Sequence, residues 1–389
     1  MSWIKTIGLN AIIVAGTILF LDAVSYIGFK GKLSTILPGY GQDASDVGRG
    51  YPRFHFAKDA DLGYDIAPNF KTSTYAKPAE YGLYDVWGNE HACFDDEWRA
   101  SDAKGGVYLA GDSFTWGYAR HETKFGTLLE KQIGEPVFAC GVTHSGQRHQ
   151  FEKFKRLDGR AINPKTVIVN VFRNDVANDF FFPNATVIDG FMVENIDICD
   201  QGVAEKRDGE FSFARIDENA LKQRLEVEMT KREESVSLKS MLKKYSMSAN
   251  VVATLTRGSR SNLNMFMQDE LSCKNAVDVE FETLDDQYAE SPLSEKNRLA
   301  IEEWIVHSKA RGYRLVFSFI PSKDPALDVS YRAIGAFIAS RGGEARYFDD
   351  YINERDLDRS KLYFRTDGHF NEYGNERYAD YLQLLLSAK

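Results

Sequence analysis

Short apolar runs alternate with amphipathic stretches from about residue 106 to the end of the chain. The apolar runs predict buried strands at residues 107–110, 137–140, 167–172, 315–320 and 347–348. The amphipathic stretches predict helices at residues 123–133, 148–157, 294–310, 330–340 and 372–387. Strand and helix alternating over this length predict an α/β fold, with a mostly parallel sheet covered by helices on both faces.

The alternation stops between about residues 184 and 292, where no strong run for a buried strand appears. We interpret this stretch as an insertion in a single α/β domain that spans residues 105–389. Its first half is dense in both charge signs, and residues 217–234 predict a solvated helix. Apolar residues at roughly helical spacing follow at 238–255. They favour a helix packed on its own domain, with a lid or a membrane-surface helix as the alternative.

The N-terminal segment from residue 7 to residue 29 is apolar all round and carries a single charge, Asp22. It reaches the ~20 residues of a membrane-spanning helix only if Asp22 lies near the membrane interface. We expect residues 1–32 to be an uncleaved membrane anchor, with a signal peptide cleaved near residues 23–25 as the alternative. Residues 33–104 would then be a linker and an N-terminal extension packed on the α/β domain. That domain would lie in the periplasm or outside the cell.

The composition narrows the class of protein. The 389 residues include 48 Lys and Arg against 57 Asp and Glu, which gives a formal net charge of −9. An acidic chain without a basic cluster is not typical of nucleic-acid-binding proteins, because affinity for phosphate backbones comes mainly from clustered Lys and Arg. An aromatic content of 13% excludes an intrinsically disordered chain, and a mean hydropathy of −0.38 excludes a polytopic membrane protein.

Four cysteines, Cys93, Cys140, Cys199 and Cys273, lack the close spacing of zinc ligands, and we predict no metal site. In an oxidising compartment four thiols allow three sets of pairings. A disulfide between Cys199 and Cys273 would close a single excursion of the chain, and we state it as a hypothesis.

The most informative motif lies where the first predicted strand ends, at Gly111-Asp112-Ser113. Open α/β sheets build their sites at the carboxyl ends of the strands, and glycines on either side of Ser113 allow a tight turn that exposes its hydroxyl. Thr115 occupies the last position of a Gly-x-Ser-x-Gly pattern, so the motif is not the nucleophile elbow of α/β-hydrolases. We interpret Ser113 as a nucleophile, and we expect Asp112 to fix the turn by hydrogen bonds.

A serine nucleophile needs a base, and the base needs a group that orients it. His369 stands in a loop just before the last predicted helix, with Asp367 two residues earlier. This loop would return to the sheet edge that carries Ser113. Asp367 would accept a hydrogen bond from Nδ1 of His369 and leave Nε2 to take the proton of Ser113. The sequence therefore predicts a triad of Ser113, His369 and Asp367.

These motifs resemble the SGNH, or GDSL, hydrolase superfamily from about residue 61 to the C-terminus, apart from the insertion. The family's nucleophile block is similar to residues 111–113, which contain Ser113. Its last block is similar to the pair Asp367 and His369. The Asp-x-His spacing of this pair resembles membrane-anchored and polysaccharide-modifying branches of the superfamily.

Two further blocks of the family supply the donors of an oxyanion hole. A glycine after the second strand is similar to Gly146, which we prefer, or to Gly141 as the alternative. An Asn-Asp pair after the third strand matches Asn174 and the residue that follows it, so the side chain of Asn174 would donate beside the main-chain amide of Ser113. A second Asn-Asp pair at residues 178–179 is assigned to the following loop.

The resemblance implies a three-layer α/β/α sandwich with a mostly parallel, flavodoxin-like sheet, and a serine-dependent ester hydrolase without metal or organic cofactor. The substrate would be an O-acyl ester of a carbohydrate, on a small molecule or a polysaccharide, and the protein would bind no nucleic acid. The N-terminal helix would contact the membrane. The alternatives are an O-acyltransferase that modifies an exported polysaccharide, and a non-catalytic carbohydrate-binding protein of the same fold.

Several other residues have two interpretations. Trp116 would either stack on a sugar ring or pack inside the protein. A loop or helix-surface role is favoured over substrate contact for His144 and His149. The three adjacent acids at residues 95–97 favour a solvated turn over a cation site, because neighbouring acids cannot easily face one metal ion.

Overall fold

The fold is described from a computed structural model of residues 1–389. The residues described are 2–33, 53–75, 81, 84–98, 105–195, 205–207, 210–212, 215–234, 245–249, 251, 284, 287–328, 330–365 and 367–387. The chain divides into two compact units. The first comprises Met1–Pro52, Ser73–Asp85 and Lys222–Phe266, and the second comprises Arg53–Thr72, Val86–Leu221 and Met267–Lys389.

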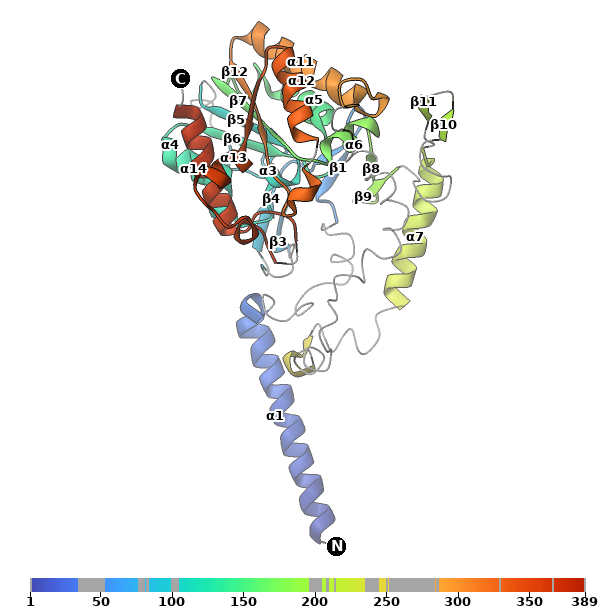
Figure 1. The fold of residues 1–389 in the computed structure, drawn as a ribbon. Coiled ribbons are helices and arrows are strands. Elements are labelled where there is room, and N and C mark those ends of the chain that lie inside the picture. The colour runs from blue at the N-terminus through green and yellow to red at the C-terminus, as the bar shows by residue number, and fades with distance from the viewer. Residues whose placement is uncertain are drawn as a thin grey trace. The chain divides into compact units, whose positions relative to one another are not determined.

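The second unit is built on a five-stranded parallel sheet in the order β13-β12-β7-β5-β6 (Figure 1). The strands are β5 (Val107–Gly111), β6 (Val137–Gly141), β7 (Thr166–Val171), β12 (Arg314–Phe319) and β13 (Glu344–Tyr347). Numbered along the chain, this is the 2-1-3-4-5 order of flavodoxin-like sheets. Each of the five predicted apolar runs overlaps one of these strands, so the prediction of a mostly parallel sheet is confirmed.

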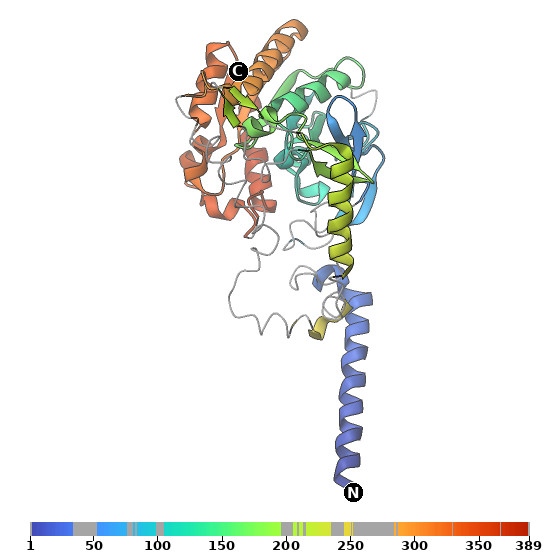
Figure 2. The same cartoon turned by 90° about the vertical axis from the view of Figure 1, so that its right-hand side faces the viewer.

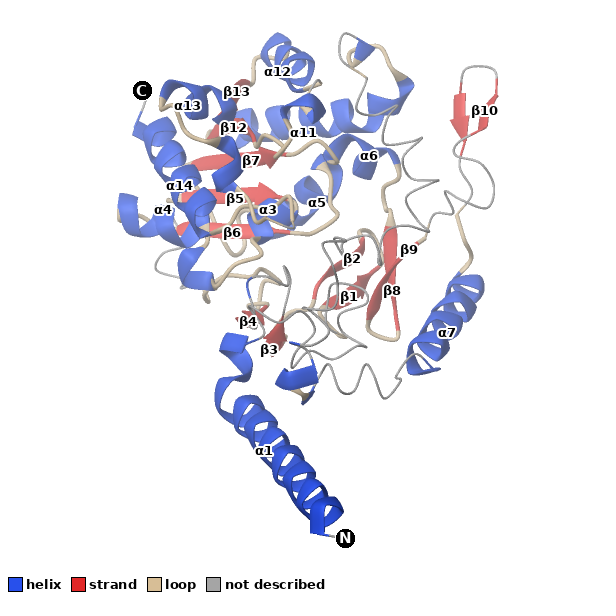
Figure 3. Ribbon diagram, turned by 60° about the horizontal axis from the view of Figure 1, so that its bottom comes forward, coloured by secondary structure: helices blue, strands red, loops and turns tan. Residues whose placement is uncertain are grey.

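Helices cover both faces of this sheet (Figure 2 and Figure 3). They are α5 (Gln147–Leu157), α11 (Glu295–Arg311) and α12 (Tyr331–Ser340) on one face, and α4 (Phe125–Ile133), α13 (Phe348–Glu354) and α14 (Glu372–Ser387) on the other. Along β5, Tyr108 and Ala110 belong to the first apolar layer, whereas Val107 and Leu109 belong to the second. Successive side chains of a strand point to opposite faces, so the sheet separates two cores. The expected three-layer sandwich is therefore confirmed.

The first unit begins with α1 (Ser2–Leu33), a helix that contains the whole apolar N-terminal segment. Asp22 interrupts the apolar run, and its Oδ1 accepts hydrogen bonds from the main-chain N and from Oγ of Ser248, both at 2.9 Å. Within the described part of the chain, no helix is both long and apolar enough to cross a membrane. The expectation of a membrane-spanning anchor at residues 1–32 is corrected accordingly.

Short strand pairs lie outside the central sheet. They are β1 (Phe56–Asp59) with β2 (Gly63–Ile66), β3 (Lys71–Tyr75) with β4 (Tyr84–Trp87), β8 (Ala185–Ile188) with β9 (Phe191–Glu194), and β10 (Glu205–Arg207) with β11 (Glu210–Ser212). The strands of the last two pairs were not expected in the insertion, because runs of three or four residues leave little periodicity. The charged helix is confirmed as α7 (Glu218–Glu234). Most of residues 238–255 lie outside the described residues.

Candidate active site

Ser113 is the first residue of a short helix, α3 (Ser113–Trp116), which is separated from β5 by the single residue Asp112. Asp112 caps this helix, because its Oδ1 accepts a hydrogen bond from the main-chain N of Phe114 at 2.9 Å. A Cβ on Gly111 would come within 2.1 Å of a side-chain oxygen of α3. The turn is therefore compact, and it requires a glycine before Asp112.

His369 and Asp367 lie against this turn. Oγ of Ser113 is 2.7 Å from Nε2 of His369. On the other side of the ring, Nδ1 of His369 is hydrogen-bonded to Oδ1 of Asp367, which also accepts the main-chain N of His369 at 2.8 Å. The ring packs against Phe114 and Tyr118, with centroid distances of 4.8 Å and 4.4 Å. These partners assign the tautomer: Nδ1–H donates to Asp367, and the hydroxyl of Ser113 donates to Nε2.

The order of the strands brings these groups to one place. Ser113 follows β5, and Asn174 follows β7, which neighbours β5 in the sheet. From β5 the chain runs to β6, which pairs with one edge of β5. It then crosses over to β7, which pairs with the other edge of β5. At such a switch point the loops after the two strands separate and leave a crevice. His369 reaches the same crevice from the loop before α14.

The carboxylate of Asp112 lies between Ser113 and Asn174. Its Oδ2 is 3.3 Å from Oγ of Ser113, whose hydrogen is directed at His369, and the carboxylate is hydrogen-bonded to the side chain of Asn174. Burial raises the pKa of Asp112, and its hydrogen bonds and the imidazole of His369 oppose that shift. Asn174 is the N-cap residue of α6 (Asp175–Phe180). The structure thus holds Asn174 beside the turn at residues 111–115, which carries Ser113.

The two candidate glycines lie in different surroundings. Gly141 ends β6, and a Cβ there would come within 2.0 Å of the main-chain N of Trp116, so Gly141 lets the nucleophile turn rest on β6. Gly146 is the N-cap residue of α5, and a Cβ there would come within 2.3 Å of Oδ1 of Asp179 and 2.5 Å of the main-chain O of Asp175. A main-chain amide at the start of a helix suits an anion. The binding role of either glycine stays a prediction.

Two buried acids on α6 were given no role in the sequence analysis. Asp179 was assigned to a loop, but it lies in α6, and burial raises its pKa to about 7. Oδ2 of Asp175 accepts hydrogen bonds from Nε2 of Gln147 at 2.6 Å and from the main-chain N of Phe172 at 3.0 Å. Burial, and then the nearby carboxylate of Asp112, raise the pKa of Asp175. A helix of six residues leaves little periodicity in the sequence. The spacing of four residues between Asp175 and Asp179 was the only feature that indicated a helix here.

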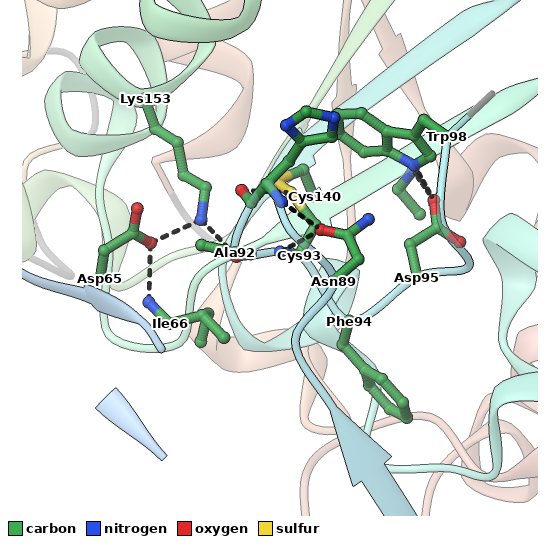
Figure 4. The surroundings of a disulfide bond; sticks show 12 residues. Asp65, Ile66, Asn89, Ala92, Cys93, Phe94, Asp95, Trp98, Cys140 and Lys153 are labelled. Carbon is green, nitrogen blue, oxygen red and sulfur yellow. Dashed lines mark hydrogen bonds and ion pairs between the residues drawn. A yellow bond between two sulfur atoms is a disulfide. The ribbon is translucent and has the colours of Figure 1, made fainter. Parts of the chain in front are cut away.

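A disulfide joins Cys93 of the N-terminal extension to Cys140 of β6 (Figure 4). The Cα atoms are 4.8 Å apart, and both side chains are buried. This pairing was not the one that we expected. Cys199 and Cys273, the hypothetical pair, lie outside the described residues.

The structure also decides between the interpretations of other residues. Trp116 is fully buried against Phe94, at a centroid distance of 4.8 Å, so it packs inside the protein. His149 is buried in α5 instead of lying on its surface, and burial lowers its pKa to about 3. Asp95 is buried and its Oδ2 accepts the main-chain N of Ala139 at 2.9 Å, so the expected solvated turn is wrong for this acid. The residues that the structure describes contain no cluster of ligands for a metal ion.

A cavity of about 520 Å³ adjoins the candidate triad. It is lined by Phe172 and Arg173 after β7, by residues 322–325 and 327 after β12, and by Gly368. Gly368 directly precedes His369, and Arg173 directly precedes the candidate oxyanion donor. The cavity therefore begins where the triad and the loop after β7 meet.

No protein family model and no curated protein matches the chain. Among solved structures, a lipolytic protein of the G-D-S-L family from Desulfitobacterium hafniense is 11% identical, with 73% of this chain and 99% of that chain covered and a TM-score of 0.36. An acetyl xylan esterase is 12% identical, with 74% and 100% covered and a TM-score of 0.34. A family 2 carbohydrate esterase with a carbohydrate-binding domain from Corynascus thermopiles (Myceliophthora fergusii) is 12% identical, with 80% and 74% covered and a TM-score of 0.29. An assignment of function therefore rests on the geometry of the site.

Proposed function

We propose that this protein is a serine-dependent esterase of the SGNH type, which cleaves O-acyl esters through an acyl-enzyme at Ser113. The observation that carries the proposal is the hydrogen-bonded chain from Oγ of Ser113, at 2.7 Å, to Nε2 of His369 and from Nδ1 to Asp367. A serine hydroxyl alone is a weak nucleophile. An adjacent imidazole that is itself oriented by a carboxylate activates it.

In the proposed reaction, Oγ of Ser113 attacks the ester carbonyl carbon while Nε2 of His369 takes the hydroxyl proton. Asp367 holds the ring in the required tautomer and stabilises the imidazolium. When the tetrahedral intermediate collapses, the imidazolium donates its proton to the leaving alcohol oxygen. A water molecule, deprotonated by His369, then hydrolyses the acyl-enzyme and releases the acid and free Ser113.

The oxyanion of each tetrahedral intermediate would be bound by the main-chain amides of Ser113 and Gly146 and by the side chain of Asn174. The amide of Asn174 carries two hydrogens, so it can bind Asp112 and still donate to an oxyanion. Donors fixed in advance at the position of developing charge are a large source of catalytic power. The position of Asn174 beside the nucleophile turn supports this role.

The substrate that we propose is an O-acylated carbohydrate. The cavity of about 520 Å³ next to Gly368 falls within the range of small-molecule sites, ~300–1,000 Å³, and would hold one side of such an ester. Arg173 and Lys323 line this cavity and offer donors for hydroxyl or carbonyl oxygens. The Asp-x-His spacing, which resembles that of polysaccharide-modifying branches, also supports a carbohydrate.

We place the protein in the periplasm or outside the cell. The buried disulfide between Cys93 and Cys140 supports this location, because disulfides form and persist mainly in oxidising compartments.

The test compares the full-length protein with a Ser113→Ala variant. A fluorophosphonate probe should label the wild-type protein and not Ser113→Ala, and release of acid from p-nitrophenyl acetate and from acetylated oligosaccharides should fall on the order of 10⁶-fold in kcat. Ser322→Ala, which changes a serine of the cavity, is the matched control and should still be labelled. Equal labelling of wild type and Ser113→Ala would overturn the proposal.

A further inference from the structure

The N-terminus of α5 is capped by another helix and not by its own N-cap residue. N-cap positions usually carry Ser, Thr, Asp or Asn, whose side chain accepts a main-chain N–H of the first turn. Here the N-cap residue is Gly146, which has no side chain to offer. The main-chain N of Gln147 instead donates to Oδ2 of Asp179 at 3.1 Å, and the main-chain N of Arg148 donates to Oδ1 at 2.8 Å.

The carboxylate that makes this cap is held from a third element. Oδ2 of Asp179 also accepts a hydrogen bond from Nδ2 of Asn297, on α11, at 2.7 Å. The hydroxyl of Tyr288 donates to Oδ1 of Asn297 at 2.5 Å and so fixes the amide in this orientation. Asp179 and Asn297 are both fully or almost fully buried. A buried carboxylate is costly unless its hydrogen bonds are satisfied, so these three donors define one position for Asp179.

The same contacts bring together the helices that carry the two proposed oxyanion donors. Asp179 lies on α6, which begins next to Asn174, and it binds the first turn of α5, which begins next to Gly146. The fit is close, since a Cβ on Gly146 would come within 2.3 Å of Oδ1 of Asp179. Any movement of this carboxylate would therefore shift the amide of Gly146 relative to Asn174.

We propose that Asp179 is a positioning residue for the oxyanion hole, which sets the main-chain amide of Gly146 against the side chain of Asn174. The proposal rests on the esterase function proposed above and adds a residue that touches neither substrate nor Ser113. The amides of Gln147 and Arg148 are used by Asp179, whereas the amide of Gly146 donates to none of the residues that the structure describes. Asp179 thereby selects which amide at this helix end faces the substrate.

The test is Asp179→Asn in the full-length protein. The amide would present an N–H₂ group to main-chain donors on α5, so the helix start would move. A misplacement of this kind in a catalytic site costs about 10²-fold. We expect kcat for p-nitrophenyl acetate, and the rate of inactivation by a fluorophosphonate, to fall about 10- to 100-fold, with KM within about twofold.

Two further variants separate positioning from a general loss of stability. Val176→Ala removes buried apolar volume from the same helix and leaves the hydrogen bonds of Asp179 in place, and it should lower the melting temperature while keeping kcat. Adding Asn297→Asp to Asp179→Asn supplies an acceptor for the new amide and should recover part of kcat.

The proposal is overturned if Asp179→Asn keeps the wild-type kcat and inactivation rate, or if Val176→Ala lowers kcat by as much as Asp179→Asn does. A wild-type protein that the probe does not label at Ser113 would instead overturn the esterase function itself.

Discussion

The turn after β5 and the loop after β6 end at the same edge of the sheet, but they are held in different ways. The turn at residues 111–115, which carries Ser113, has hydrogen bonds among its own residues and their neighbours: the carboxylate of Asp112 accepts the main-chain N of Phe114, and Oγ1 of Thr115 donates to the main-chain O of Ala110 at 3.2 Å. A later strand adds to them, since Nδ2 of Asn170 on β7 donates to Oγ1 of Thr115 at 2.9 Å. The loop after β6 also has a local hydrogen bond, from Oγ of Ser145 to the main-chain O of Val142 at 2.6 Å. The helix that follows this loop has no cap from its own N-cap residue and is capped instead by Asp179 on α6.

This difference shows which parts of the candidate site depend least on the rest of the chain. The cap of α3 joins residues two positions apart, so it can form as soon as β5 is in place. The cap of α5 joins residues 31 and 32 positions apart, so it forms only when α6 docks. The start of α3 at Ser113 is thus encoded in a short motif, whereas the start of α5 next to Gly146 depends on packing between α5 and α6.

Among these predictions, removing the side-chain amide of Asn174 should have the largest effect on kcat. Asn174→Ala deletes the side-chain amide at the start of α6 and should lower kcat about 10²–10³-fold, because that amide would bind the oxyanion only in the transition state. KM should change little, and loss of the hydrogen bond to the buried carboxylate of Asp112 should lower the free energy of unfolding by about 1–3 kcal/mol. Steady-state kinetics and denaturant unfolding measure both quantities. The matched control, Asn163→Ala, removes an exposed amide before β7, at the end of that strand away from Asn174, and an equal loss in both variants would contradict the assignment of Asn174.

The same contrast explains how much could be predicted from the sequence. The five strands and the triad were predicted, because buried runs are periodic and because Ser113, Asp367 and His369 stand in short motifs. The contacts of Asp179 were missed, because its partners on α5 are set by packing and not by spacing. The disulfide between Cys93 and Cys140 was missed as well, since these cysteines are 47 positions apart and meet only when the extension packs on β6.

A substitution at Gly141, on which the turn at residues 111–115 packs, should lower the stability of the fold. Gly141→Ala would place a Cβ within 2.0 Å of the main-chain N of Trp116, and backbone atoms cannot yield as a flexible side chain can. We expect a loss of about 3 kcal/mol in the free energy of unfolding, since overpacking of this kind costs ~1–3 kcal/mol or more. Denaturant titration measures it. In Gly368→Ala the added Cβ meets no atom within 4 Å, so this control should stay near wild-type stability.

The smallest expected effect concerns His149, the buried histidine of α5. Burial lowers the pKa of His149 to about 3, below its usual 6.5. As the pH falls below 6.5, the unfolded chain therefore binds a proton that the folded protein does not, and the folded state loses stability until about pH 3. His149→Phe removes this loss, so the variant should be more stable than the wild type by about 2 kcal/mol at pH 5.

Near pH 8 the two proteins should differ by less, because His149 is then neutral in both the folded and the unfolded state. Neither ring nitrogen of His149 has a hydrogen-bond partner among the described residues, so replacing the ring by phenyl breaks no hydrogen bond. The ring lies 4.9 Å from that of Tyr64 and 6.0 Å from that of Phe182, and an aromatic replacement keeps these contacts. Denaturant unfolding of both proteins from pH 4 to pH 8 measures the effect. Parallel curves would show that His149 is protonated equally in the two states, and that the start of α5 is more open to water than its packing indicates.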